Sequence, residues 1–226
     1  DFEVKISLPD PPYLLAIQFD DALTDLGIKI VEEPTTSRDF RMQGIEMDED
    51  VRTDVFTTYS PTLSSIVYYT NIQSVNLFAE HLLCHLGNGS AYSGTFNVQD
   101  FWAGKGVDTE GMYVNDGSGL SRATVATAKQ FVEVLDYMTG STNFNSLWKS
   151  LPVAGESGSL RSMCKGTLAE GNVRAKSGYM TRVRSYAGYV DTQSGDRIAF
   201  AMISNNFNCS PTTMKQLMET IMVAMA

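Results

Sequence analysis

The 226-residue sequence is poor in the residues that build metal sites and disulfide frameworks. It contains two histidines and three cysteines, Cys84, Cys164 and Cys209. The cysteines are odd in number and widely spaced, so they give neither a zinc-binding pattern nor a complete set of disulfides. Cys84 lies between His81 and His85 on a predicted helix. Side chains one helical turn apart could in principle bind the same metal ion. No third ligand stands at the spacing of a known zinc motif, which favours packing and polar roles.

The sequence also lacks an excess of positive charge and long apolar runs. Lys and Arg number 17 against 26 Asp and Glu, which gives a net charge of −9 and a pI near 4.7. Phosphate binding needs a basic surface, so nucleic acid is not an expected partner. No apolar run is long enough to span a bilayer, and no internal repeat is present. No signal peptide is visible and Asp1 is the first residue, so we expect a mature or excised segment.

The periodicity predicts helices first and an antiparallel hairpin with a closing helix last. Helices are expected over residues 11–26, 60–71, 75–86, 97–103 and 124–139, and from Ser210 onward. Short strands are expected at residues 28–31 and 51–58, with a loop over 32–52. Further strands are expected at residues 173–180, 186–190 and 197–204, the last two joined by a turn at 193–196. The predicted fold class is α/β of the α+β kind, an antiparallel sheet covered by helices.

Two predicted helices carry an apolar face. The first has Leu15, Phe19, Ala22, Leu23 and Leu26 on one side. The last has Met214, Leu217, Met218, Ile221, Met222 and Met225. The methionine-rich face would suit a partner groove, but its spacing is that of a core stripe, which favours packing on the sheet.

Lys176-Ser177-Gly178 falls on a predicted strand and brings three properties together. The lysine charge attracts a carboxylate and can lower the pKa of a neighbouring serine. The Ser177 hydroxyl donates to the same carboxylate, and Gly178 lets a substrate lie against the strand edge. The next residue, Tyr179, would aim its backbone N–H at a developing oxyanion. Taken alone, such a tripeptide is more often a surface strand end.

Ser74-Val75-Asn76 opens a predicted helix, where a serine is a common N-cap. The functional interpretation requires more of these residues. The Ser74 hydroxyl would shuttle a proton and the Asn76 amide would hold a substrate carbonyl, both pointing into one cleft with Lys176.

The order of several further segments strengthens both motifs. These segments are residues 59–64, 76–80, 116–122, 151–155 and 171–176. In this succession, from about residue 58 to 206, the sequence resembles the D-alanyl-D-alanine carboxypeptidase/endopeptidase family, the class C low-molecular-mass penicillin-binding proteins. The resemblance implies a penicillin-binding transpeptidase/β-lactamase-like fold and no metal or organic cofactor. It also implies an extracytoplasmic, periplasmic location.

By this resemblance Ser74 and Asn76 match the second motif of the family, and Lys176, Ser177 and Gly178 match the third. The implied substrates are peptidoglycan stem peptides ending in D-Ala-D-Ala, or peptide cross-links, cleaved through a serine acyl-enzyme. β-Lactams are implied as inhibitors of the intact enzyme. Ser177 and Tyr179 both stand where the family usually has Thr, so the leaving-group pocket is expected to differ near Tyr179.

The first motif of the family, S-x-x-K, is missing from its usual place. The strings that begin at Ser146 and Ser162 both follow Ser74, in the wrong order, and are interpreted as chance matches. We therefore expect the nucleophile to lie outside this chain. Residues 1–57, first helix included, would be the junction with missing or inserted domains, and residues 58–226 the C-terminal part of the carboxypeptidase domain.

Three functions stay open at this point. The leading one is a serine-type D-Ala-D-Ala carboxypeptidase or endopeptidase, inactive as this fragment alone. A non-catalytic peptidoglycan- or penicillin-binding module would bind reversibly without acylation. A β-lactamase or esterase would use the same scaffold.

Overall fold

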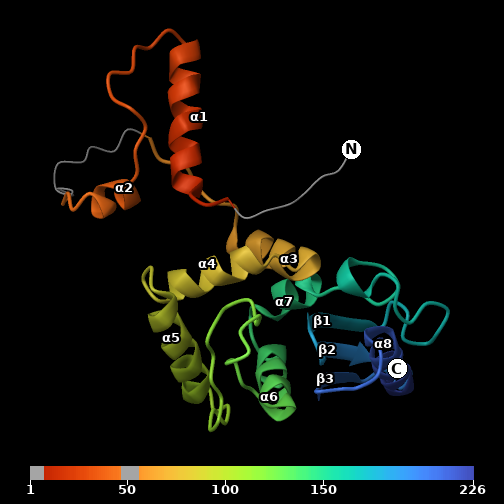
Figure 1. The fold of residues 1–226 in the computed structure, drawn as a ribbon. Coiled ribbons are helices and arrows are strands. Elements are labelled where there is room, and N and C mark those ends of the chain that lie inside the picture. The colour runs from red at the N-terminus through yellow and green to blue at the C-terminus, as the bar shows by residue number, and fades with distance from the viewer. Residues whose placement is uncertain (1–7, 47–55) are drawn as a thin grey trace. The chain divides into compact units, whose positions relative to one another are not determined.

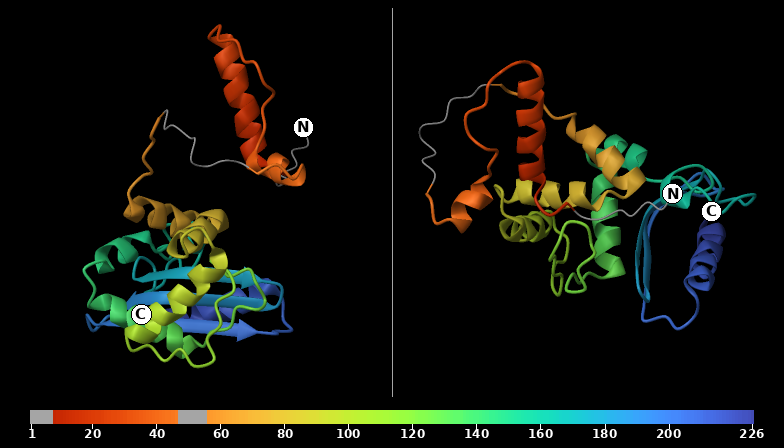
Figure 2. Two further views of the ribbon diagram at one scale, coloured as in Figure 1. Left: turned by 90° about the vertical axis from the view of Figure 1, so that its left-hand side faces the viewer. Right: turned by 45° about the horizontal axis from the view of Figure 1, so that its top comes forward.

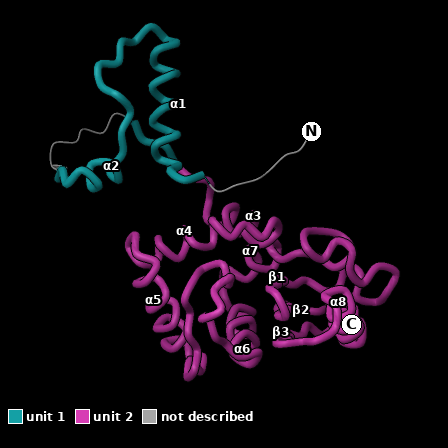
Figure 3. The backbone as a smooth tube through the Cα atoms, viewed as in Figure 1, with its two compact units in different colours: residues 1–59 teal, residues 60–226 magenta. Residues whose placement is uncertain are grey.

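The computed structural model describes residues 8–46 and 56–226. The chain divides into two compact units between Tyr59 and Ser60 (Figure 3). The predicted boundary at residue 57 is close to this division, while the role of the first segment as a junction stays a prediction. No helix within the described residues is both long enough and apolar enough to span a bilayer.

The first unit contains two helices. α1 (Pro11–Asp25) begins where the Asp10 carboxylate accepts a hydrogen bond from the Tyr13 N–H, with proline in the first turn, as predicted. α2 (Ser37–Met42) lies in the segment predicted to be a loop. Its short length gives little periodicity, and the signal for it is the capping box formed by Thr36 and Asp39.

The described residues of this unit contain none of the predicted strand structure. Residues 28–31 and 56–58 are not strands, because a strand needs a neighbour and the described part of the chain pairs none with them. Residues 51–55 lie outside the described residues. The apolar face of α1 is not a core face, since α1 buries no residue and Leu15, Phe19 and Leu26 are 68%, 63% and 77% exposed.

The second unit combines helices with one sheet (Figure 1). Its helices are α3 (Leu63–Gln73), α4 (Asn76–Leu86), α5 (Ala91–Gly104), α6 (Ala128–Thr139), α7 (Phe144–Ser150), the 3-10 turn η2 (Gly158–Leu160) and α8 (Pro211–Met225). Its strands are β1 (Val173–Met180), β2 (Val183–Asp191) and β3 (Arg197–Asn205). The sheet is antiparallel in the order β1-β2-β3, which confirms the predicted fold class and the predicted hairpin.

Helices cover both faces of the sheet, with α8 on one side and α6 on the other (Figure 2). On the α8 side, Tyr186 and Phe200 pack with Met218 and Met222. On the other side, Tyr189 packs with Leu135 of α6 and with the aromatic residues of α7. The two cores follow from the alternation of side chains along each strand.

The methionine face of α8 packs on the sheet as predicted. Met214, Met218, Met222 and Met225 all belong to the core or contact it. Leu217 and Ile221 differ from the prediction, because they are 54% and 50% exposed at the margin of this face.

Helix starts are set by caps further along the chain than predicted. α3 begins after Thr62, whose hydroxyl accepts from the Ser65 N–H, rather than at Ser60-Pro61. α6 begins after Thr127, which forms a capping box with Gln130, rather than at Thr124. α7 was not predicted at all. Its seven residues are too few to show a clear apolar period.

α5 (Ala91–Gly104) is longer than the predicted helix over residues 97–103. It starts after Ser90, whose hydroxyl accepts from the Ser93 N–H. Gly94 lies inside the helix, where a Cβ atom would stand only 2.1 Å from the Leu83 carbonyl oxygen of α4. The glycine is therefore required by the close crossing of α4 and α5, not by a turn.

Candidate active site

Ser74 caps the end of α3 and does not start α4 as predicted. Its backbone is left-handed, with φ 54° and ψ 51°, and its N–H donates to the Thr70 carbonyl. Val75 takes the N-cap position of α4 and makes no side-chain cap. A left-handed conformation is uncommon for a residue other than glycine. It turns the chain sharply and leaves the Ser74 hydroxyl free of any capping role.

Lys176 on β1 joins the two predicted motifs directly. Its Nζ donates to the Ser74 Oγ at 2.8 Å, across 102 residues of sequence, and to the Ser177 carbonyl oxygen at 3.0 Å. The predicted convergence of Ser74 and Lys176 on one place, with Lys176 on a strand beside the hairpin, is thus present in the structure.

The Lys176 ammonium group is partly buried and has no acidic partner among the described residues. Burial lowers its pKa below the ordinary value for lysine. Its two hydrogen bonds leave an ammonium N–H available. A partly desolvated cation of this kind is stabilised when an anion binds beside it.

Ser177 faces a second hydroxyl that the sequence did not single out. The Ser177 Oγ donates to the Ser159 Oγ of η2 at 2.7 Å. Gly158, the residue before Ser159, lets η2 lie close to α3, since its φ is +53° and a Cβ there would lie 2.9 Å from the Ile72 carbonyl oxygen. Ser159 follows the matched segment 151–155 by a few residues, but no spacing rule ties it to Ser177. Only the tertiary contact reveals it.

The outer edge of β1 is open beside this cluster. Its first half is covered, because the Ala175 N–H donates to the Pro152 carbonyl and the Val173 carbonyl accepts from Ala154. Backbone groups alternate in direction along a strand, so the N–H groups of Ser177 and Tyr179 face the same edge. The described residues offer these two groups no acceptor. An extended peptide could pair with them.

Gly178 and Asn76 flank the cluster without joining its hydrogen bonds. Gly178 pairs with Ser185 across the sheet, and a Cβ on it would approach the Ser185 Oγ to 2.5 Å. Asn76 is the first residue of α4 and is exposed. Among the described residues its side chain makes no hydrogen bond, so its assigned role stays a prediction.

The strings that begin at Ser146 and Ser162 lie elsewhere in the second unit. Ser146 is exposed on α7. The Ser162 Oγ accepts from the Lys215 Nζ at 3.1 Å, not from its own lysine at position 165. Neither serine hydrogen-bonds to a predicted site residue, which agrees with their interpretation as chance matches.

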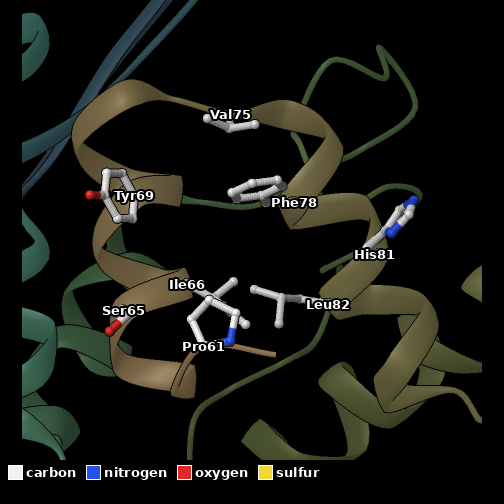
Figure 4. Close-up of a pocket in the computed structure, with 8 residues that line it drawn as sticks. All are labelled: Pro61, Ser65, Ile66, Tyr69, Val75, Phe78, His81 and Leu82. Atoms are coloured by element: carbon white, nitrogen blue, oxygen red, sulfur yellow. The ribbon is translucent and has the colours of Figure 1, made fainter. Parts of the chain in front are cut away.

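An apolar cavity of about 600 Å³ lies between α3 and α4 (Figure 4). Its lining residues are Pro61, Ser65, Ile66, Tyr69, Val75, Phe78, His81 and Leu82. It approaches the loop at Val75 but contains neither Ser74 nor Lys176, so the polar cluster at the strand edge is the better candidate site. Within residues 8–46 and 56–226, no three His, Cys, Asp or Glu side chains are placed to hold a metal ion.

Comparison with known proteins finds relatives that are named carboxypeptidases. The D-alanyl-D-alanine carboxypeptidase of Actinomadura sp. (strain R39) is 35% identical over 210 residues, covering 88% of this chain and 38% of that protein. The penicillin-sensitive carboxypeptidase A of Dictyostelium discoideum is 29% identical over 237 residues, covering 97% and 43%. The chain therefore spans about two fifths of the length of these relatives.

A solved structure shares the fold. Penicillin binding protein 4 from Haemophilus influenzae, complexed with a β-lactam, matches 97% of this chain and 51% of its own, with a TM-score of 0.78 and 19% identity. The model of the D-Ala-D-Ala carboxypeptidase 3 (S13) family matches residues 2–226. With these motifs in this order and this match along the chain, the protein belongs to the D-Ala-D-Ala carboxypeptidase 3 (S13) family.

Proposed function

We propose that this chain forms part of a serine-type D-Ala-D-Ala carboxypeptidase or endopeptidase that acts on peptidoglycan stem peptides through an acyl-enzyme. The observation that carries the proposal is the contact between Lys176 and Ser74 beside the Ser177 hydroxyl. Supporting it are a lysine without an acidic partner among the described residues, two hydroxyl groups and an open strand edge close to one another. Extracytoplasmic, periplasmic action and inhibition of the intact enzyme by β-lactams follow from this proposal.

The substrate carboxylate would lie at the edge of β1. Lys176 would attract it by charge, and the hydroxyl groups of Ser177 and Ser159 would donate to it. The peptide would extend along the edge, where the Tyr179 N–H can donate to the carbonyl oxygen as negative charge develops. Asn76 would hold the peptide on the other side of the scissile bond.

The chemical step would use a serine from outside this chain. That serine oxygen would bond to the scissile carbonyl carbon while its proton passes to a partner lysine, also outside the chain. The C–N bond would then break, and Ser74 would relay a proton to the nitrogen of the leaving D-Ala. The hydrogen bond from Lys176 holds the Ser74 hydroxyl in place for this relay.

A second function is a binding module that recognises the same peptides or penicillin without hydrolysis. It is favoured by one observation: among the described residues, no S-x-x-K serine lies beside Ser74 and Lys176. The sequence of the full-length gene product separates the two functions. An S-x-x-K motif upstream supports the enzyme.

The test of the enzyme is a Lys176→Ala variant of the full-length protein. Losing a charge-assisted contact to a partly desolvated carboxylate removes about 1.5–3 kcal/mol of transition-state binding, roughly a ten- to hundredfold loss in kcat/KM. Lys176→Arg should restore little of the lost kcat/KM, because the planar guanidinium group does not fit a site shaped for a compact ammonium group. D-Ala release from a peptide ending in D-Ala-D-Ala is the measurement.

Lys129→Ala is the matched control, since Lys129 is an exposed lysine of α6 that pairs with Asp108 and Glu133. It should leave kcat/KM unchanged. A folded Lys176→Ala variant with unchanged kcat/KM would refute the role assigned to Lys176.

A further inference from the structure

Arg184 lies beside the candidate carboxylate site on the neighbouring strand. In the register of β1 and β2, Tyr179 pairs with Arg184 and Ser177 pairs with Tyr186. Alternation places these four side chains on one face of the sheet, the face that α8 covers. Arg184 is thus the diagonal neighbour of Ser177, at a typical Cα separation of about 7–8 Å.

Aromatic neighbours hold the Arg184 guanidinium in place. It lies over the Tyr179 ring at 4.6 Å from the ring centroid, and its Nη1 donates to the Tyr186 hydroxyl at 3.0 Å. Tyr186 is itself 1% exposed and therefore a rigid support. A guanidinium fixed in this way loses little side-chain entropy when it binds a ligand.

The hydrogen bonds of Arg184 are incomplete. Its Nε is buried and has no acceptor among the described residues. No carboxylate of the described chain pairs with it either. A ligand cannot reach the buried Nε, but among the described residues the only hydrogen bond from the terminal nitrogens is the one from Nη1 to Tyr186. The terminal N–H groups can therefore donate to a ligand that brings an acceptor. The planar guanidinium matches a carboxylate, which can accept from two N–H groups at once.

We propose that Arg184 is a specificity-determining residue that recognises the terminal α-carboxylate of the peptide. The proposal rests on the proposed function, since it concerns the same substrate. Lys176 and Arg184 lie on opposite faces of the sheet, Lys176 next to Ser177 on β1 and Arg184 diagonal to Ser177 on β2, and in this proposal both side chains reach a carboxylate bound at the edge of β1. A carboxylate there meets two cations, whereas a peptide ending in a carboxamide meets two unpaired charges.

Reversible binding needs no nucleophile, so the 226-residue chain itself can be tested. The probes are Nα,Nε-diacetyl-L-Lys-D-Ala-D-Ala and the same peptide ending in a carboxamide, titrated by two-dimensional NMR. Arg184→Gln should weaken binding of the carboxylate peptide on the order of tenfold and leave the carboxamide peptide unchanged. Arg184→Lys should restore part of the loss, because it keeps the charge but not the fork.

Arg182→Gln is the matched control. Arg182 is exposed two residues away and donates to the Asn206 carbonyl at 3.2 Å, so its loss should not change either affinity. Unchanged cross-peaks far from the site show that the variants are folded.

The outcomes separate this proposal from the proposed function. If Lys176→Ala weakens carboxylate binding but Arg184→Gln does not, only the role of Arg184 is wrong. If Arg184→Gln weakens both peptides equally, Arg184 merely supports Tyr179 and the proposal is overturned. If the unmodified chain shows no preference for the carboxylate peptide, the proposal for Arg184 is overturned, while D-Ala release by the full-length protein still decides the proposed function separately.

Discussion

Gly94 shows how a single residue sets the distance between two helices. An alanine in a helix interior is normally more stable than glycine by roughly 1 kcal/mol. At Gly94 the added Cβ would stand 2.1 Å from the Leu83 carbonyl oxygen, a backbone atom that cannot move away by itself. The steric cost therefore outweighs the gain in propensity.

We expect Gly94→Ala to lower the free energy of unfolding by about 1–3 kcal/mol, as overpacking does elsewhere. Gly104→Ala is the control within α5, because nothing lies within 4 Å of a Cβ at that position. It should be neutral or slightly stabilising. Urea unfolding of both variants is the measurement, and equal stabilities would show that α4 and α5 can separate without cost.

At the candidate site, Ser74 is a second case in which the conformation of one residue sets the local geometry. Its left-handed backbone and its contact with Lys176 belong together, because the sharp turn after α3 presents the hydroxyl to β1. A residue held in a sparsely populated conformation is sustained by its surroundings. Here the surroundings are the chain turn between two helices.

At the scale of elements, α4 anchors the loop that follows α5. The Glu80 carboxylate accepts from the N–H groups of Gly117 and Ser118, each at 2.9 Å. Asp116 accepts from Ser121 and Thr124 within the same loop. Burial alone would raise the pKa of both carboxyl groups, but the hydrogen bonds outweigh it and the pKa of each is lowered.

This anchoring predicts a loss of stability in acid. Since the pKa of Glu80 is lower in the folded chain than its ordinary value of 4.5, its contribution is complete above that pH and is lost as the pH falls through the folded pKa. Glu80→Gln should reduce the free energy of unfolding at pH 7 by about 1–2 kcal/mol, allowing for solvent exposure. The same substitution should also make the free energy of unfolding less dependent on pH below about 4.5. Unfolding measured from pH 3 to 7 is the check.

Asp100→Asn is the control for this prediction. Asp100 is exposed on α5, and its carboxylate accepts no hydrogen bond within the described residues. Its substitution should change neither the stability at pH 7 nor the acid dependence. If Glu80→Gln behaves like Asp100→Asn, the loop does not depend on its carboxylate anchor.

At the scale of the whole molecule, neither S-x-x-K serine of the second unit hydrogen-bonds to the Lys176–Ser74 pair. We therefore expect this chain alone to form no covalent adduct with a fluorescent penicillin. The reason is geometric, because neither Ser146 nor Ser162 hydrogen-bonds to Lys176 or Ser74. Labelling followed by denaturing electrophoresis is the measurement. Stoichiometric, denaturation-resistant labelling would contradict the prediction and would point to Ser146 or Ser162.

Local sequence signals were enough to predict the sheet and its closing helix. Alternating side chains defined β1 and β3, the turn at 193–196 joined the hairpin, and Ser210-Pro211 started α8. These signals are local, so they are legible without the rest of the chain. The motifs Ser74-Val75-Asn76 and Lys176-Ser177-Gly178 were also visible, and with their neighbours they indicated the family.

The details of the site depend on how distant parts of the chain pack together. Ser74 is a left-handed cap at the end of α3 and not a helix start as predicted. The contact of Ser159 with Ser177 and the position of Arg184 over the Tyr179 ring were not predicted. The helices α2 and α7 were not predicted either, and α1 has no core face. Each depends on burial, on contacts between residues distant in sequence or on a backbone angle. A linear pattern carries no measure of these, because they arise from the packing of elements against one another.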